Sequence, residues 1–166
     1  MTATGVRIRR AVPEDAPRIL ELDRELAHFE KLTPPNDEEG RRLLAWIFES
    51  GRLEALVAEL DGRIEGIALF YEGLGTFRAK AFLYLEDLVV ADAARSRGVG
   101  EALMAALARE VVSRGALRLE WSVLDWNVHA IRFYDRLGAR QPKEWVKYTL
   151  EGDALARLAQ RSENAT

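Results

Sequence analysis

The hydrophobic pattern of the chain changes its period across one short loop, from that of a strand to that of a helix. The run from Lys80 to Val90 is apolar except for two adjacent acids, and it predicts a buried strand. After the loop, apolar residues recur every four positions up to Gly115, which predicts a helix over 98–114. The residues of this stripe are Val99, Leu103, Leu107 and Val111. A strand followed by such a helix favours a fold in which helices cover a sheet.

Similar patterns predict the other elements. Asp61-Gly62 between two apolar runs is a strong hairpin signal, and Pro13, followed by acids, opens a helix. The further predicted strands cover 6–11, 53–60, 63–71, 117–123 and 145–150, and the further predicted helices cover 13–30, 37–49, 127–137 and 153–159. This order predicts an α/β or α+β fold with a central mixed sheet flanked by helices.

The length of 166 residues is that of one ordinary domain. No internal repeat, low-complexity tract or long linker interrupts the chain, and the Pro34-Pro35 break only separates two predicted helices. We therefore expect a single domain over 1–166 that ends in a polar tail at 161–166.

Composition excludes several functional classes. Hydrophobic residues make up 48% and charged residues 31%, which is typical of globular rather than disordered proteins. The absence of cysteine excludes a disulfide framework and a thiol nucleophile. The 24 basic and 27 acidic residues give a net charge of −3. A negative net charge disfavours binding to the phosphate backbone of nucleic acid over a large surface. No signal peptide and no apolar run of membrane-spanning length is present, so we expect a cytoplasmic protein without membrane contact.

The loop between strand and helix has the composition of an anion site. It contains two arginines and two glycines over 95–100, directly before a helix N-terminus. Unpaired N–H groups at such a terminus bind phosphate, and glycines let the phosphate approach the main chain. From the spacing alone, a tight turn with two solvated arginines is an equal alternative. Neither a Walker loop nor a dinucleotide fingerprint fits the residues.

Glu86 and Asp87 interrupt the apolar strand over 80–90. Successive strand residues face opposite sides, so at least one of these acids is expected in a cleft rather than on the solvated surface. Burying an unpaired carboxylate is costly, so such a residue is ion-paired, hydrogen-bonded or functional. A structural ion pair therefore stays an alternative to a role in binding a cation or accepting a proton.

A third segment, over 126–138, combines an N-cap Asn127 with the aromatic pair Phe133-Tyr134 and a closing Gly138. Adjacent residues on a helix point about 100° apart, so Phe133 can face the core while Tyr134 faces elsewhere. On these residues alone, a packing role for Tyr134 is the more common outcome than a catalytic role.

Together, the three segments resemble the GNAT superfamily of N-acetyltransferases. The residues that carry the resemblance are Arg95-x-x-Gly98-x-Gly100 after Leu85-Glu86-Asp87, and Asn127-x-x-Ala130-x-x-Phe133-Tyr134 before Leu137-Gly138-Ala139. The segments Tyr84-Leu85-Glu86-Asp87 and Trp126-Asn127, together with Trp145, are closer to the branch of diamine (spermidine/spermine) and thialysine acetyltransferases. The resemblance covers nearly the whole chain and implies a GNAT fold with a mostly antiparallel mixed sheet.

The resemblance implies acetyl-CoA as co-substrate. The loop would hold its pyrophosphate, and the preceding strand would pair with its pantetheine arm. The residues implied for cofactor binding are Leu88, Val89, Val90, Arg95, Ser96, Arg97, Gly98, Val99, Gly100, Glu101, Asn127 and Ala130. Tyr134 matches the tyrosine that protonates the departing CoA sulfur in this family.

A primary amine acceptor must lose a proton before it attacks a thioester. With an amine pKa near 10.4, that loss costs about 4.6 kcal/mol at pH 7. Glu86 is the expected proton acceptor, and direct attack of the amine is the expected mechanism. The residues implied for substrate binding are Phe29, Glu30, Glu86, Asp87, Glu120, Glu144 and Trp145. For Glu30, Glu120 and Glu144, an ordinary surface acid is an equal alternative.

The segment over 72–80 departs from the spermidine enzymes, because it lacks their acidic-aromatic pair and carries Arg78 and Lys80. These cations would repel a long polycation, so we expect a shorter, lysine-like amine such as thialysine. Two alternatives remain: acetylation of protein N-termini or lysines, and an idle module that only binds acyl-CoA. His28 and His129 are too isolated for a metal site. A homodimer is implied by the resemblance alone.

Overall fold

The computed structural model of the protein describes residues 5–163. Its internal contacts divide the chain into two compact units, Met1–Ser122 and Val123–Thr166. Among the helices of the described chain, none has the length and hydrophobicity that crossing a membrane requires.

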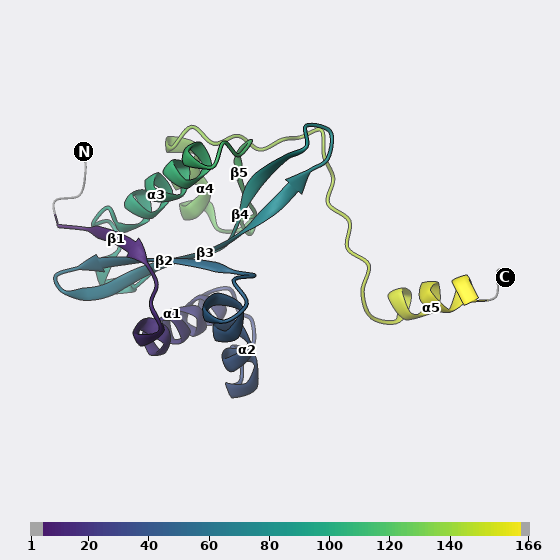
Figure 1. The fold of residues 1–166 in the computed structure, drawn as a ribbon, viewed down its shortest axis with the longest axis horizontal. Coiled ribbons are helices and arrows are strands. Elements are labelled where there is room, and N and C mark those ends of the chain that lie inside the picture. The colour runs from purple at the N-terminus through teal and green to yellow at the C-terminus, as the bar shows by residue number, and fades with distance from the viewer. Residues whose placement is uncertain (1–4, 164–166) are drawn as a thin grey trace. The chain divides into compact units, whose positions relative to one another are not determined.

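The first unit is built on a five-stranded sheet in the order β1-β2-β3-β4-β5 (Figure 1). The strands are β1 (Arg7–Arg10), β2 (Glu54–Leu60), β3 (Arg63–Gly75), β4 (Lys80–Val90) and β5 (Leu119–Trp121). The first four pair antiparallel, and β4 and β5 pair parallel. The predicted α/β class with a mixed, mostly antiparallel sheet is therefore confirmed, although β5 is shorter than the strand predicted over 117–123.

Helices cover both faces of this sheet. Figure 1 shows α1 (Ala16–Phe29) and α2 (Asp37–Phe48) on one face and α3 (Val99–Ser113) on the other. The start of α2 is fixed by a capping box, in which the Asn36 side chain accepts from the N–H groups of Glu38 and Glu39 at 2.9 and 3.0 Å. The Glu39 carboxylate accepts in return from the Asn36 N–H.

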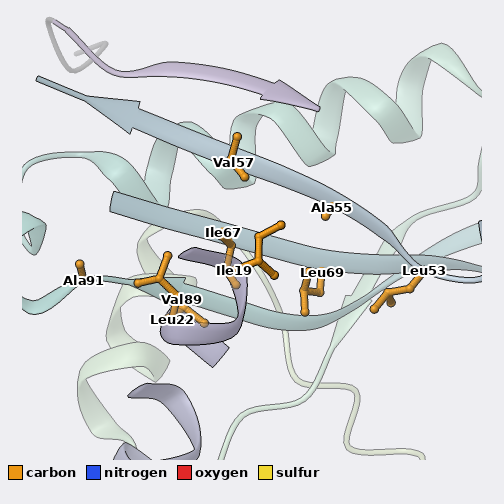
Figure 2. Close-up of a cluster of buried hydrophobic side chains, with 9 residues drawn as sticks. All are labelled: Ile19, Leu22, Leu53, Ala55, Val57, Ile67, Leu69, Val89 and Ala91. Atoms are coloured by element: carbon orange, nitrogen blue, oxygen red, sulfur yellow. The ribbon is translucent and has the colours of Figure 1, made fainter. Parts of the chain in front are cut away.

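Alternate residues of β3 face opposite sides of the sheet. Ile67 and Leu69 join Ile19 and Leu22 of α1 in a buried cluster (Figure 2). Gly66, on the opposite face, lies under α3, where an added Cβ would come within 2.7 Å of Val99 Cγ1. The helix therefore approaches the sheet more closely than any side chain at residue 66 would permit.

The pairing between β3 and β4 contains a bulge. Leu69 pairs with Asp87 and the next residue, Phe70, pairs with Leu85, so Glu86 is an extra residue in β4. A bulge interrupts the alternation of side chains along a strand. The two acids are consequently not forced to opposite faces, which corrects the expectation from simple alternation.

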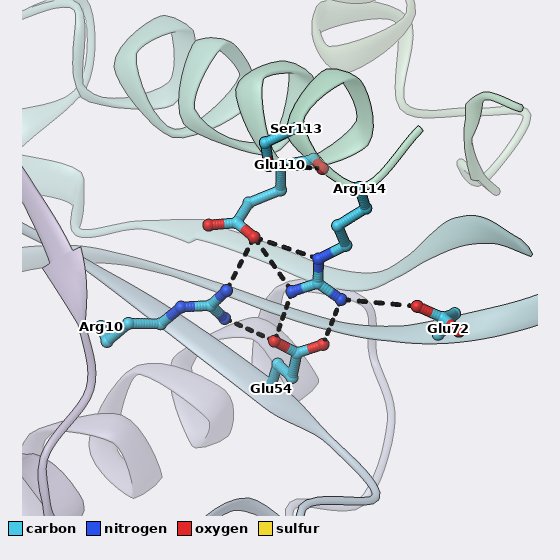
Figure 3. Close-up of polar contacts among 6 residues, drawn as sticks. All are labelled: Arg10, Glu54, Glu72, Glu110, Ser113 and Arg114. Atoms are coloured by element: carbon cyan, nitrogen blue, oxygen red, sulfur yellow. Dashed lines mark hydrogen bonds and ion pairs between the residues drawn. The ribbon is translucent and has the colours of Figure 1, made fainter. Parts of the chain in front are cut away.

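An ionic network joins the edge of the sheet to the end of α3 (Figure 3). Arg114 binds Glu54 with two hydrogen bonds of 2.6 and 2.7 Å and binds Glu110 at 2.9 Å. Arg10 reaches the same two carboxylates at 2.6 and 2.8 Å. Burial alone would raise the pKa of Glu54, but the hydrogen bonds and charges of Arg114 and Arg10 hold it below its ordinary value.

The second unit contains α4 (Val128–Arg136) and α5 (Gly152–Glu163). The strand predicted over 145–150 is wrong, because this segment has no regular structure. Its apolar residues alternate as in a strand, but a strand also needs a hydrogen-bonded neighbour, and none of the described residues supplies one. The last helix runs into the predicted polar tail up to Glu163, and residues 164–166 lie outside the described chain.

Candidate active site

The loop between β4 and α3 forms a tight turn that ends on a helix N-terminus. A short 3-10 helix, η2 (Asp92–Ala94), begins it. Ser96 and Gly98 both have positive φ, 61° and 82°, so the backbone curls before α3 starts. Gly98 is the N-cap of α3 and provides no side-chain cap to the N–H groups of the first turn. N–H groups without a side-chain cap at a helix start can bind an anion, so an anion site here stays a prediction.

The two arginines of this loop make exposed ion pairs. Arg95 Nη2 lies 2.8 Å from Asp92 Oδ1, and its guanidinium lies 5.4 Å from the centre of the Phe29 ring. Arg97 Nη2 lies 2.7 Å from Asp61 Oδ2 in the hairpin between β2 and β3. Exposed pairs of this kind contribute at most about 1 kcal/mol, so an arriving phosphate can replace either carboxylate.

Strand β4 has a partner on only one side over its last residues. The parallel pairing with β5 ends at Leu85 and Trp121, whereas the pairing with β3 continues to Val90. Over Leu88–Val90, no other strand of the described chain occupies the second edge. This free edge leads directly to the loop before α3, so it has the placement expected for pairing with an extended, amide-containing ligand.

Four carboxylates gather where α1 faces the bulge of β4. The pKa of Asp87 is raised to about 7, and burial is the largest cause. The neighbouring negative charges of Asp23, Glu86 and Glu30, in that order, supply the rest of this rise. Burial also raises the pKa of Asp23 and of Glu30, both on the α1 side. The site is therefore acidic, and at neutral pH it holds carboxylates that gain stability by meeting a cation.

Asp23 is the member of this group that the sequence reading missed. It lies four residues after Ile19 and three before Leu26, two apolar residues of the α1 stripe, so helical spacing places it beside the buried side. That spacing was the available signal. Its burial, however, depends on the sheet that packs against α1.

Two tyrosines flank the acids on the same sheet. The Tyr71 and Tyr84 rings lie 5.3 Å apart, and Tyr84 Oη makes a 2.9 Å hydrogen bond with Ser122 Oγ. Burial and then the charge of Glu86 raise the pKa of Tyr71. Glu86 is therefore close enough to Tyr71 for its charge to act on the phenol.

The other predicted substrate acids differ from these four. Glu120 forms an exposed salt bridge with Arg118, so it already has a basic partner. Glu144 and Trp145 lie in the irregular segment of the second unit, and Trp145 is 81% exposed. In the part of the chain that the structure describes, no three His, Asp or Glu side chains are arranged to hold a metal ion.

The remaining predicted residues lie in α4, within the second unit. Asn127 caps this helix, because its side-chain oxygen accepts from the Ala130 N–H at 3.1 Å. Tyr134 lies about one helical turn after Ala130, and its ring is 5.2 Å from that of Phe133. The cap confirms the predicted start of this helix.

Comparison with known proteins identifies the family. The chain matches the model of the acetyltransferase (GNAT) family over residues 17–139. It is 30% identical over 195 residues to an L-ornithine N5-acetyltransferase of Arabidopsis thaliana, across 90% of this chain and 86% of that relative. It is 32% identical over 169 residues to a thialysine N-epsilon-acetyltransferase of Mus musculus, across 95% and 99% of the two chains.

Solved structures agree on the fold. A crystal structure of a probable acetyltransferase has a TM-score of 0.80 at 23% identity, with 89% of this chain and 98% of the other covered. An integron cassette protein from V. cholerae has a TM-score of 0.78 at 23% identity, with 95% and 99% covered. At this identity the likeness shows the fold alone. The family match shows more: the chain belongs to the acetyltransferase (GNAT) family, and it is an acetyltransferase.

Proposed function

We propose that the protein transfers the acetyl group of acetyl-CoA to a primary amine of a small molecule. The observation that carries this proposal is the group of carboxylates around the β4 bulge, which no basic side chain of residues 5–161 neutralises by a salt bridge. Such a group of carboxylates favours an ammonium ion over a neutral or anionic acceptor.

The donor would bind to the loop before α3 and to the free edge of β4. The uncapped helix start and the side chains of Arg95 and Arg97 suit the pyrophosphate, and Leu88–Val90 suit the pantetheine arm. Bound acetyl-CoA supplies the thioester that reacts. The residues proposed for this role are Leu88, Val89, Val90, Arg95, Ser96, Arg97, Gly98, Val99, Gly100, Glu101, Asn127 and Ala130.

The acceptor would enter through the carboxylates of α1 and β4. Glu86 is exposed at the bulge and attracts the ammonium group, and Phe29, at the end of α1, offers an aromatic face to the alkyl stem. A carboxylate at the bulge then takes the amine proton, and the sequence favours Glu86 for that role. Tyr134 is proposed to give a proton to the leaving sulfur.

We propose a short, lysine-like amino acid as the acceptor. Support comes from the relatives named for ornithine and thialysine, and from the exposed Arg78 and Lys80 at the tip of the β3–β4 hairpin. These two cations attract a carboxylate and repel a second ammonium group.

A homodimer is also proposed, on the strength of the sequence resemblance. The segment over 145–150 supports it, since Trp145, Val146 and Tyr148 are exposed apolar or aromatic residues on an extended stretch. Light scattering at several concentrations tests this assembly, and a mass that stays at one chain would contradict it. A cytoplasmic location stays a prediction from the sequence.

A thiol-release assay tests the main proposal. The protein is incubated with acetyl-CoA and, separately, with thialysine, ornithine, lysine, spermidine and a peptide with a free N-terminus. We expect the amino acids to give the highest kcat/KM and the peptide the lowest. A preference for the peptide would assign the protein to protein acetylation instead, and a preference for spermidine would overturn the proposed acceptor class.

A further inference from the structure

Asp23 of α1 and Asp87 of β4 are brought together by the packing of the core between them. Leu22, the residue before Asp23, is completely buried in the cluster that also contains Leu69 and Val89 (Figure 2). Leu69 is the residue opposite Asp87 in the ladder, and Val89 is two positions further along β4. The same contacts that hold α1 on the sheet therefore set the positions of both carboxylates.

The charged and titratable groups that face Asp87 come from three elements. Helix α1 contributes Asp23 and, at its end, Glu30, and β4 itself contributes Glu86. Strand β3 contributes Tyr71, which lies beyond Glu86.

The basic residues of α1 are engaged elsewhere. Arg24 makes an ion pair with Asp37 at 3.4 Å, and its charge lowers the pKa of Asp23 only in part. Arg18 binds the Ile64 carbonyl oxygen and the Glu21 carboxylate. None of the salt bridges among the described side chains, residues 5–161, involves Asp23 or Asp87.

We propose that Asp23 and Asp87 act as a couple, in which Asp87 accepts the proton of the acceptor amine and Asp23 is the positioning residue that keeps Asp87 basic. This inference rests on the proposed amine acetylation, and it moves the proton-accepting role from Glu86 to its neighbour. Glu86, exposed at the bulge, keeps the task of attracting the ammonium group.

The chemistry favours Asp87, which is more buried than Glu86. A carboxylate becomes a stronger base when burial and a second negative charge disfavour its ionised form, and general-base catalysis improves as base strength rises. Burial is the larger cause of the raised Asp87 pKa, and Asp23 is the largest of the charge contributions.

The proposed reaction conserves atoms, protons and electron pairs. The ammonium group gives one proton to Asp87, and the freed nitrogen lone pair forms the C–N bond with the thioester carbonyl carbon. The C–S bond breaks, and its electron pair leaves on sulfur. The nitrogen loses a second proton, and the sulfur gains one, so that the products are the amide, the free thiol and one released proton.

The pH dependence of kcat/KM for the Asp23→Asn variant tests the Asp23–Asp87 couple. The asparagine removes the charge but keeps the shape, so Asp87 should become more acidic and a weaker base. Above about pH 8, kcat/KM should fall by ~3-fold relative to the parent, because the base is weaker. Below about pH 6 the variant should instead be faster, since more of Asp87 is ionised there. The titration of the amine is the same for both proteins, so it cancels in the ratio of the variant kcat/KM to the parent kcat/KM.

Matched variants separate this effect from loss of structure. Asp23→Glu restores the charge and should return the ratio toward one across the pH range. Glu21→Gln removes an exposed charge from the same helix and should leave the profile unchanged. A ratio for Asp23→Asn that stays constant with pH would overturn the couple.

A second measurement tests the Asp23–Asp87 couple independently of the proposed function. If the parent released no thiol with any amine, the proposed function would fail. The couple would then be judged by NMR titration of the 13C-labelled Asp87 carboxyl. Its midpoint should fall in Asp23→Asn and not in Glu21→Gln, and an unmoved midpoint in Asp23→Asn would overturn the couple.

Discussion

Asp87 lies directly opposite Leu69 in the ladder between β4 and β3. Leu69 is completely buried in the cluster under α1, so the register that pairs these residues also directs the Asp87 carboxylate toward an apolar interior. Burial, as the larger cause, and the charges of nearby acids together raise the pKa of Asp87 from 3.8 to about 7. The ionised form therefore destabilises the fold, and the protonated form does not.

Replacing Asp87 by asparagine should stabilise the protein in a pH-dependent manner. The folded-state pKa lies above the unfolded value, so the folded state binds the extra proton, and stability is lost as pH rises from about 4 through about 7. Asp87→Asn removes this loss. Its free energy of unfolding should exceed that of the parent by up to about 4 kcal/mol at pH 8, and by much less at pH 5.

Urea denaturation of parent and variant at both pH values measures this difference. Asp37→Asn, which changes an acid with 90% side-chain exposure, is the control and should show no such trend. An equal effect of Asp87→Asn at pH 5 and pH 8 would contradict the raised pKa.

The close contact between β3 and the start of α3 predicts a cost for any side chain at Gly66. In Gly66→Ala, the added Cβ would lie 2.7 Å from Val99 Cγ1 and 3.1 Å from the Val89 carbonyl oxygen. Relieving this overlap should cost about 1–3 kcal/mol of folding free energy. Because Val99 begins the helix whose N-terminus is proposed to bind pyrophosphate, the KM for acetyl-CoA should also rise.

Gly40→Ala is the matched control in this case. Its added Cβ would lie 3.4 Å from the flexible end of Leu20, and the substitution favours the helical state by up to about 1 kcal/mol. A neutral or stabilising result is expected there. If Gly66→Ala were equally well tolerated, the close approach of α3 would be wrong.

The network in Figure 3 predicts that Arg114 is more important for stability than its position at a helix end suggests. Its guanidinium binds Glu54 and Glu110 and lies over the Phe70 ring at 5.8 Å. Arg114→Ala would leave two half-buried carboxylates with one shared partner, and should cost about 2–3 kcal/mol. Arg42→Ala, which removes an exposed pair within α2, should cost at most about 0.5 kcal/mol. Similar losses in the two variants would show that the network contributes little.

Sequence periodicity predicted most of the fold because each element buries one face. The stripe of α3 and the hairpin at Asp61-Gly62 depend only on neighbouring residues, so they are visible in the chain itself. The strand predicted over 145–150 was wrong because side-chain alternation indicates which residues could line a strand but not which neighbour pairs with it.

The candidate site was predicted only in part for the same reason. Glu86 and Asp87 stand out as acids in an apolar run, but the bulge that frees them from strict alternation depends on how β3 pairs with β4. Asp23 is a single acid beside a helical stripe, and only the packing of Leu22 on the sheet explains its burial. Glu120 was also predicted as a substrate acid; it forms an exposed salt bridge with Arg118, and its role in substrate binding stays a prediction.

The proposed pyrophosphate site predicts a selective effect of removing Arg95. This side chain is half exposed and has only weak surface partners, Asp92 and Phe29, so Arg95→Ala should leave folding nearly unchanged. Loss of a charge-assisted contact to phosphate should raise the KM for acetyl-CoA by about 10-fold, with a smaller effect on kcat. Arg52→Ala, which removes an arginine stacked on Trp46, is the control. An unchanged KM in Arg95→Ala would place the pyrophosphate elsewhere.

Tyr134→Phe tests whether a phenol delivers the proton to the leaving sulfur. The substitution removes one oxygen and leaves the ring that neighbours Phe133, so α4 should keep its structure. A thiolate leaving group with a pKa near 8.5 needs that proton less than an alkoxide would, but loss of a general acid still lowers kcat by about 100-fold. The KM values should change little, because the hydroxyl acts in the transition state rather than in substrate binding. Tyr148→Phe, a change at an exposed tyrosine of the same unit, should leave kcat unaffected. Since thiols that are more acidic depart without help, an acetyl thioester of a low-pKa thiol should be transferred by Tyr134→Phe almost as fast as by the parent, and a defect of the same size with both donors would instead assign Tyr134 a purely structural role.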